Sequence, residues 1–139
     1  MNTPSIRCQN VWKVFGAAPE EFERAGGAEM DAAALQAKGW TAAVRDATFD
    51  ISAGEVFVIM GLSGSGKSTI VRCLSRLIEP TNGQILVEGT DLLAASLAEL
   101  NDIRRRKMGM VFQHFALLPK RDLMGNIGIP LLVQGVPSA

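Results

Sequence analysis

Short apolar runs separated by glycine-rich and polar turns predict a chain that mixes strands with helices. Ser5–Phe15 and Ala43–Ile51 are rich in β-branched and aromatic residues and are predicted to be strands. Val56–Met60 (VFVIM) is apolar on both faces, which predicts a strand buried inside a parallel sheet. Gln84–Val87 and Met108–Phe112 are predicted to be shorter strands, each beside a turn or loop.

Helical character appears between these strands. The Ala- and Glu-rich stretch 17–41 predicts two short surface helices, the second at about Glu29–Lys38. Lys67–Ile78 carries apolar residues at helical spacing, and Pro80 is expected to stop that helix. On this helix, Arg76 is expected to lie on the exposed face.

A third helix has a clear start signal. Ser96, followed three residues later by Glu99, forms the pattern of a capping box and predicts a helix to about Arg106. The tail after Asp122 is weakly helical, because glycine and proline interrupt it. The fold class predicted from all these segments is α/β.

Size and charge narrow the possible functions. With 139 residues, 47% of them hydrophobic, the chain suits one folded domain and not a disordered segment. Its formal net charge is +0, and the basic run Arg104–Lys107 is interpreted as a solvated helix end, so no nucleic-acid partner is expected. Cys8 and Cys73 match no metal spacing, which favours a reducing compartment. The first ten residues contain no apolar core, so no secretory signal is expected.

The strongest chemical signal is the run GLSGSGKS at Gly61–Ser68, which fits the phosphate-binding pattern G-x-x-x-x-G-K-[ST]. An apolar strand is predicted to enter it and a helix to leave it, as the pattern requires. Glycines allow successive backbone N–H groups to converge on an anion, and the helix N-terminus adds further donors. The expected nucleotide-binding residues in this loop are Gly61, Ser63, Gly64, Ser65, Gly66, Lys67, Ser68 and Thr69.

Within this loop, different side chains have different expected roles. Lys67 is expected to reach the β- and γ-phosphates of a nucleotide, and Ser68 to bind Mg²⁺ through its hydroxyl. Thr69 supplies a second hydroxyl. A glycine-rich turn that binds nothing is the alternative, and the predicted strand–loop–helix context argues against it.

Two longer segments resemble a known family. IMGLSGSGKSTIVRCLSRLIEPTNGQILVEG at Ile59–Gly89 and IRRRKMGMVFQHFALLP at Ile103–Pro119 are similar to the ATP-binding subunits of ABC transporters, in particular the glycine betaine/L-proline (quaternary amine) importers. The stretch 17–41 resembles the helical insertion of that branch. The resemblance implies an ABC-type P-loop core from residue 56, beside an antiparallel β subdomain.

The resemblance also implies two roles that the residues alone would not reveal. Phe15, at the end of the first predicted strand, occupies the position of the aromatic that stacks on adenine; its alternative role is a strand residue packed in the core, for which Trp12 is the better candidate. Gln113 matches the Q-loop glutamine, which contacts Mg²⁺ or the attacking water. With Lys67 it forms the expected catalytic pair, and with Ser68 the expected metal site.

The same resemblance implies a setting for the protein. Its cofactors would be ATP and Mg²⁺, and its partners membrane permease subunits, a second ATP-binding subunit and, indirectly, a solute-binding protein. It would lie peripherally on the cytoplasmic face of the plasma membrane and couple ATP hydrolysis to uptake of an osmoprotectant.

The family's signature segment, Walker B strand and switch histidine are expected to follow residue 139. The chain therefore resembles the N-terminal part of an ABC ATP-binding domain, which by itself would be inactive in hydrolysis. A non-catalytic nucleotide-binding or regulatory role is the alternative function. A P-loop kinase or GTPase is disfavoured, because no NKxD stretch for guanine occurs.

Overall fold

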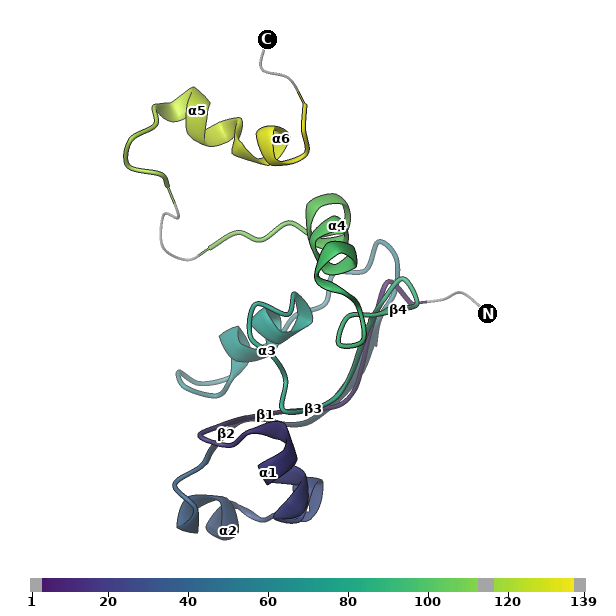
Figure 1. Ribbon diagram of the computed structural model, residues 1–139, viewed down its shortest axis with the longest axis vertical. Coiled ribbons are helices and arrows are strands. Elements are labelled where there is room, and N and C mark those ends of the chain that lie inside the picture. Colours follow the sequence, from purple (N-terminus) through teal and green to yellow (C-terminus); the bar gives the residue numbers. More distant parts are fainter. Residues whose placement is uncertain (1–3, 113–116, 137–139) are drawn as a thin grey trace. The chain divides into compact units, whose positions relative to one another are not determined.

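A computed structural model describes residues 4–112 and 117–136 of the chain, which divides into two compact units, Met1–Ala95 and Ser96–Ala139. The first unit holds all the strands of the described residues, with the P-loop helix and the helices of the insertion (Figure 1). Its elements are β1 (Ile6–Phe15), α1 (Pro19–Arg24), the 3₁₀ turn η1 (Gly27–Glu29), α2 (Ala32–Ala37), β2 (Thr41–Ile51), α3 (Lys67–Leu74), β3 (Asn82–Val87) and β4 (Thr90–Asp91). The second unit contains α4 (Leu97–Lys107), α5 (Leu123–Ile127) and α6 (Ile129–Val133).

The sheet of the first unit has the strand order β2-β1-β3-β4, and every neighbouring pair is antiparallel. Cys8 of β1 pairs with Phe49 on one side and with Ile85 on the other, so the middle of β1 is covered by both neighbours. Buried Thr81 extends the pairing beyond β3: its hydroxyl accepts a hydrogen bond from Val14 N–H at 2.9 Å. The predicted strands at both ends of the insertion and at Gln84–Val87 are therefore confirmed, together with the antiparallel subdomain.

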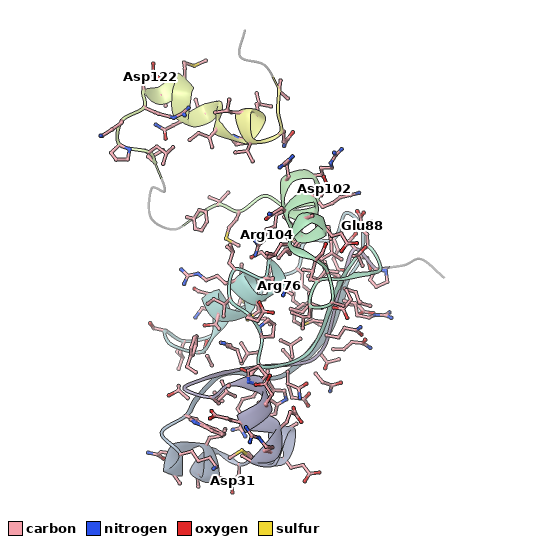
Figure 2. All side chains as sticks on the ribbon, in the orientation of Figure 1. Asp31, Arg76, Glu88, Asp102, Arg104 and Asp122 are labelled. Atoms are coloured by element: carbon pink, nitrogen blue, oxygen red, sulfur yellow. The ribbon has the colours of Figure 1, made fainter. Side chains whose placement is uncertain are left out.

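The insertion folds against one end of this sheet. Trp12 and Val14 of β1 form a core with Phe22 of α1, with Met30 at the end of η1, and with Leu35 of α2. The ring centroids of Trp12 and Phe22 lie 5.5 Å apart. The two predicted helices are present, and Trp12 is confirmed as a core aromatic. Both helices are less superficial than expected, because each buries one large side chain in this core. An aspartate, Asp31, caps α2 by accepting the Ala34 N–H, so α2 begins later than predicted (Figure 2).

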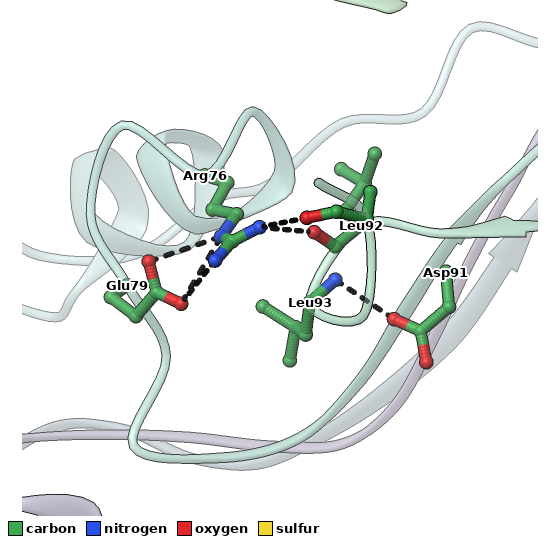
Figure 3. A network of polar contacts seen from close by, with 6 residues as sticks. Arg76, Glu79, Asp91, Leu92 and Leu93 are labelled. Atoms are coloured by element: carbon green, nitrogen blue, oxygen red, sulfur yellow. Dashed lines mark hydrogen bonds and ion pairs between the residues drawn. The ribbon is translucent and has the colours of Figure 1, made fainter. Parts of the chain in front are cut away.

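The helix that follows the phosphate loop is shorter than predicted. α3 ends at Leu74, well before Pro80, because Arg76 adopts a left-handed conformation with φ of 52°. Its side chain is 16% exposed and donates to the carbonyl oxygens of Leu92 at 2.7 Å and Ala95 at 3.1 Å, while it pairs with Glu79 at 2.9 Å (Figure 3). The prediction that Arg76 lies on an exposed face is therefore wrong: its guanidinium ties the end of α3 to the segment after β4.

The prediction of a buried strand at Val56–Met60 is also wrong for this structure. Among the described residues nothing pairs with it, and Val56, Val58 and Met60 are 88%, 65% and 85% exposed. Met108–Phe112 likewise forms no strand, and Val111 is 100% exposed. An apolar run becomes a buried strand only where neighbouring strands supply hydrogen bonds and cover.

In the second unit the predicted capping box is confirmed. Ser96 Oγ accepts the Glu99 N–H at 3.3 Å, and the Glu99 carboxylate accepts the Ser96 N–H at 2.9 Å, so α4 begins where the pattern placed it. The weakly helical tail forms two short helices, of which α5 is capped by Asp122 (Figure 2). Across the described ranges, no helix is both long and apolar enough to cross a membrane.

Candidate nucleotide-binding site

The loop Gly61–Gly66 turns the chain from the exposed apolar segment into α3. Its turn is closed by a hydrogen bond from Ser65 N–H to the Leu62 carbonyl at 3.2 Å. Gly66, the last residue before the helix, has φ of 85°. Residues with a Cβ rarely adopt that conformation, so the loop depends on a glycine where it meets the helix.

Gly66 also lies against the backbone of the sheet. A Cβ built on it would come within 1.9 Å of the Ala43 carbonyl oxygen. Ala43 is the extra residue of a bulge in β2, since Lys13 pairs with Val44 and Val14 pairs with Ala42. Bulges are over-represented beside functional sites, and here the bulge and the glycine together set how closely the loop approaches the sheet. The sequence carried no signal for Ala43.

The N-terminus of α3 has no side-chain cap, because its N-cap residue is Gly66. A cavity of about 170 Å³ borders this end and is lined by residues that offer backbone N–H groups, hydroxyls and one ammonium group: Ala43, Gly64, Ser65, Gly66, Lys67, Ser68 and Thr69. The first N–H groups of a helix have no partners within the helix, and its dipole favours a negative charge there. The lining of this cavity is therefore chemically suited to an anion.

The ammonium group of Lys67 lies across the loop. Its Nζ donates to the Leu62 carbonyl oxygen at 2.5 Å and to Ser65 Oγ at 3.4 Å. Both acceptors are uncharged groups of the loop itself. A phosphate that enters the cavity can therefore bind the Lys67 ammonium without breaking an ion pair. Ser68 and Thr69 line the same cavity with their hydroxyls. These donors fit a polyphosphate, and the Ser68 hydroxyl fits a magnesium ion bound to it.

A larger cavity of about 430 Å³ adjoins the loop. Ser65, Gly66 and Lys67 border it, and much of the rest of its lining is apolar, from β2 and the segment after it. Phe49 and Phe57 stack within this lining with their ring centroids 4.8 Å apart. The phosphate loop therefore has an apolar neighbourhood, which the sequence suggested only through the apolar run before the loop.

The predicted adenine platform lies near the phosphate loop. Phe15 is the last residue of β1, its side chain is 45% exposed, and it pairs with Thr41 of β2. Ala43, two residues further along β2, borders the phosphate cavity. The sheet therefore brings Phe15 and the loop to the same stretch of β2, although far apart in the sequence. Gln113, the predicted sensor and metal ligand, falls outside the described residues.

Two buried thiols belong to the elements beside the loop: Cys8 lies in β1 and Cys73 in α3. Burial raises the pKa of the Cys8 thiol to about 12 and that of the Cys73 thiol to about 11. Both are free and inaccessible, and across the described ranges no cluster of three or more His, Cys, Asp or Glu side chains could hold a metal ion. These cysteines therefore act as packing residues.

Comparison with known proteins gives a consistent result. The family model described as ABC transporter matches residues 44–134. The trimethylamine N-oxide transport system ATP-binding protein TmoW of Pelagibacter ubique is 45% identical over 98% of this chain and 40% of its own length. The glycine betaine/proline betaine transport system ATP-binding protein ProV of Escherichia coli is 44% identical over 94% of this chain and 33% of its own length.

Solved structures agree with this match. The dimeric structure of MJ0796, a bacterial ABC transporter cassette, superposes with a TM-score of 0.73 at 30% identity, covering 96% of this chain and 49% of that one. A post-hydrolysis state of MJ0796 bound to ADP and Pi gives a TM-score of 0.74 at 28% identity, with 96% and 50% covered. This chain spans 33–40% of the length of the two curated relatives named above.

The fold and the loop define an ABC-type P-loop nucleotide-binding core with an antiparallel β subdomain. The chain belongs to the ABC transporter family, and over most of its length it is similar to ATP-binding subunits of quaternary amine importers.

Proposed function

We propose that this chain binds ATP with Mg²⁺ and serves in the ATP-binding subunit of an importer for a quaternary amine such as glycine betaine, or for proline. The observation that supports nucleotide binding best is the uncapped N-terminus of α3, where a cavity of about 170 Å³ is lined by N–H, hydroxyl and ammonium donors. The similarity to TmoW and ProV supports the class of solute, which the chain itself does not contact in this proposal.

Each residue has a distinct task in this proposal. The backbone N–H groups around Gly64 and Gly66 hold phosphate oxygens, and Lys67 leaves the Leu62 carbonyl to neutralise the β- and γ-phosphates. Ser68 binds the magnesium ion, which supplies charge neutralisation of the phosphates when bound. Phe15 stacks on the adenine, and Gln113 reports the state of the nucleotide.

The proposed partners follow from the relatives. TmoW and ProV are named as ATP-binding proteins of transport systems, and the MJ0796 cassette is described as dimeric. We therefore expect the protein to pair with a second ATP-binding subunit and to dock on membrane permease subunits at the cytoplasmic face. A solute-binding protein is expected to be an indirect partner.

Nucleotide binding and hydrolysis separate in this chain. The residues that line the phosphate cavity offer donors for an anion and include no carboxylate, whereas P-loop ATPases usually need a carboxylate to bind Mg²⁺ and to activate the attacking water. We expect the chain by itself to bind ATP without measurable turnover. Steady-state ATPase activity that Lys67→Ala abolishes, measured on this chain alone, would show that expectation to be wrong.

Isothermal titration of the chain with ATP and Mg²⁺ tests the proposal. Wild-type protein should bind, and Lys67→Ala should weaken binding about 10- to 100-fold, as expected for loss of a charged hydrogen bond. Lys38→Ala in the insertion, which removes a lysine outside the phosphate cavity, is the matched control and should bind like wild type. Absence of binding by a wild-type chain that melts cooperatively overturns the proposal.

A further inference from the structure

A second lysine lies beside the proposed adenine platform. Lys13 and Phe15 are two residues apart in β1, so their side chains leave the same face of the strand. The opposite face carries Trp12 and Val14, which are buried under the insertion. The Lys13 Nζ lies over the Phe15 ring, 5.1 Å from its centroid. The ammonium therefore lies over the ring of a residue that is 45% exposed.

The surroundings of Lys13 leave its charge available to this ring. Lys13 is half-buried. Its positive charge also acts on α3, where it opposes the rise in pKa that burial imposes on the Cys73 thiol. Lys13 takes no part in the ion pairs Arg7–Asp50, Arg76–Glu79 and Arg106–Asp102. A cation above an aromatic face is attracted by the ring quadrupole.

Lys13 is not part of the phosphate cavity, since the lining of that cavity begins at Ala43 and includes no residue of β1. Its ammonium is directed at the ring of Phe15 and not at the N-terminus of α3. A direct phosphate contact is therefore less consistent with the geometry than an effect exerted through Phe15.

We propose that Lys13 is a positioning residue of the nucleobase site. It holds the Phe15 ring from one side and draws electron density toward that side. The purine then stacks on the opposite, electron-depleted face, which suits an electron-rich base. This inference rests on the proposed function, because it assigns Lys13 a role in the ATP site proposed above.

The test separates the base from the phosphates. Binding of ATP and of inorganic tripolyphosphate, each with Mg²⁺, is measured by calorimetry for the wild-type chain, Lys13→Met and Lys13→Arg. Lys13→Met keeps the aliphatic stem without the charge and should weaken ATP binding about 2- to 5-fold, the size of an exposed cation–π contact. Tripolyphosphate binding should not change, and Lys13→Arg should restore ATP binding.

Two controls make the result specific. In a Phe15→Leu background, Lys13→Met should cause no further loss, because the ring through which it acts is gone. Lys38→Met removes a cation at the same 5.1 Å from another ring, Trp40 in the insertion, and should leave ATP binding unchanged. Together these controls distinguish an effect through Phe15 from a general loss of positive charge.

The measurements distinguish failure of this inference from failure of the proposed function. Equal losses for ATP and tripolyphosphate would assign Lys13 to the phosphates and overturn the inference. Unchanged ATP binding by Lys13→Met, with wild-type binding intact, would overturn it too while leaving the proposed function standing. If the wild-type chain bound neither ligand, both would fall together.

Discussion

The helices α3 and α4 begin in opposite ways. Ser96 and Glu99 close the start of α4 with reciprocal hydrogen bonds between side chains and backbone N–H groups. α3 begins at Gly66, which has no side chain to offer, and a cavity borders its exposed donors. The first N–H groups of every helix need partners from outside the helix. In α4 the capping box supplies such partners, whereas α3 has no side-chain cap, and in the proposed function a phosphate takes that place.

This difference separates two uses of the same physics. A capping box stabilises the start of a helix and satisfies N–H groups there, which are then not available to a ligand. A helix with glycine at its N-cap lacks that stabilisation, and glycine also loses more conformational entropy on folding. Because glycine has no Cβ, however, its backbone can approach an anion closely. The comparison therefore predicts that changes at the start of α3 alter ligand binding, whereas changes at the start of α4 alter only stability.

The largest effect is expected at Gly66. Gly66→Ala places a Cβ against the Ala43 carbonyl at a φ of 85°, so it should lower the free energy of unfolding by about 3 kcal/mol or more and abolish ATP binding. Urea unfolding measures the first quantity and calorimetry the second. Gly64→Ala is the matched control: its φ is also positive, at 78°, but a Cβ there meets nothing within 4 Å, so about 1 kcal/mol is expected. Equal losses for both variants would contradict the role of the close approach.

The other end of α3 provides the next largest effect. Arg76→Met removes the donor to the Leu92 and Ala95 carbonyls and the partner of Glu79, and should cost about 2 kcal/mol in unfolding free energy. Arg72→Met, on the exposed face of the same helix, should change stability by less than about 0.5 kcal/mol. Similar urea midpoints for the two variants would show that the Arg76 network does not stabilise the first unit.

The buried thiols of Cys8 and Cys73 predict that the folded protein loses stability at alkaline pH. Their folded pKa values, about 12 for Cys8 and about 11 for Cys73, exceed the usual thiol value of 9.0. The unfolded chain therefore loses its thiol protons first as the pH rises above 9. Stability is then complete below pH 9 and falls as the pH approaches the folded values, by about 1 kcal/mol for each thiol at pH 10. Urea midpoints between pH 8 and 10 test this, and constant midpoints over that range would contradict it.

The smallest effect belongs to the capped helix. Ser96→Ala should lower the stability of α4 by about 1 kcal/mol and leave ATP binding unchanged. Hydrogen exchange of the α4 amides is the suitable measurement, because it reports local opening. Asp31→Ala, which removes the cap of α2, is expected to act in the same way in the insertion. A loss of ATP affinity in Ser96→Ala would break the proposed contrast between the two helices.

Predictions from the sequence agree with the structure where a feature depends on residues close together in the chain, and fail where it depends on distant residues. The capping box at Ser96 and the turn of the phosphate loop depend on residues a few positions apart, and the structure contains both. The early end of α3 was missed because Arg76 bonds to carbonyls of Leu92 and Ala95, far along the chain. The strand predicted at Val56–Met60 is absent from the structure, because strand formation depends on a partner that the local pattern cannot supply.

The same distinction holds for the candidate site. The residues of the loop and the identity of Lys67 as its cation were evident in the pattern at Gly61–Ser68. The bulge at Ala43 that makes Gly66 necessary, and the ammonium of Lys13 over Phe15, became visible only in three dimensions. The only signal in the sequence that could have indicated this contact is the spacing of Lys13 and Phe15, two residues apart on one predicted strand.

By itself the amino-acid sequence determined the phosphate loop, the capped start of α4, and the strands on either side of the insertion, because backbone torsions and nearby hydrogen bonds decide such features. The tertiary structure alone decided where α3 ends, which apolar segments are covered, and which side chains from β1 and β2 surround the loop. Those outcomes depend on groups distant in the chain meeting in space, and only the packing of the sheet against the helix brings them together.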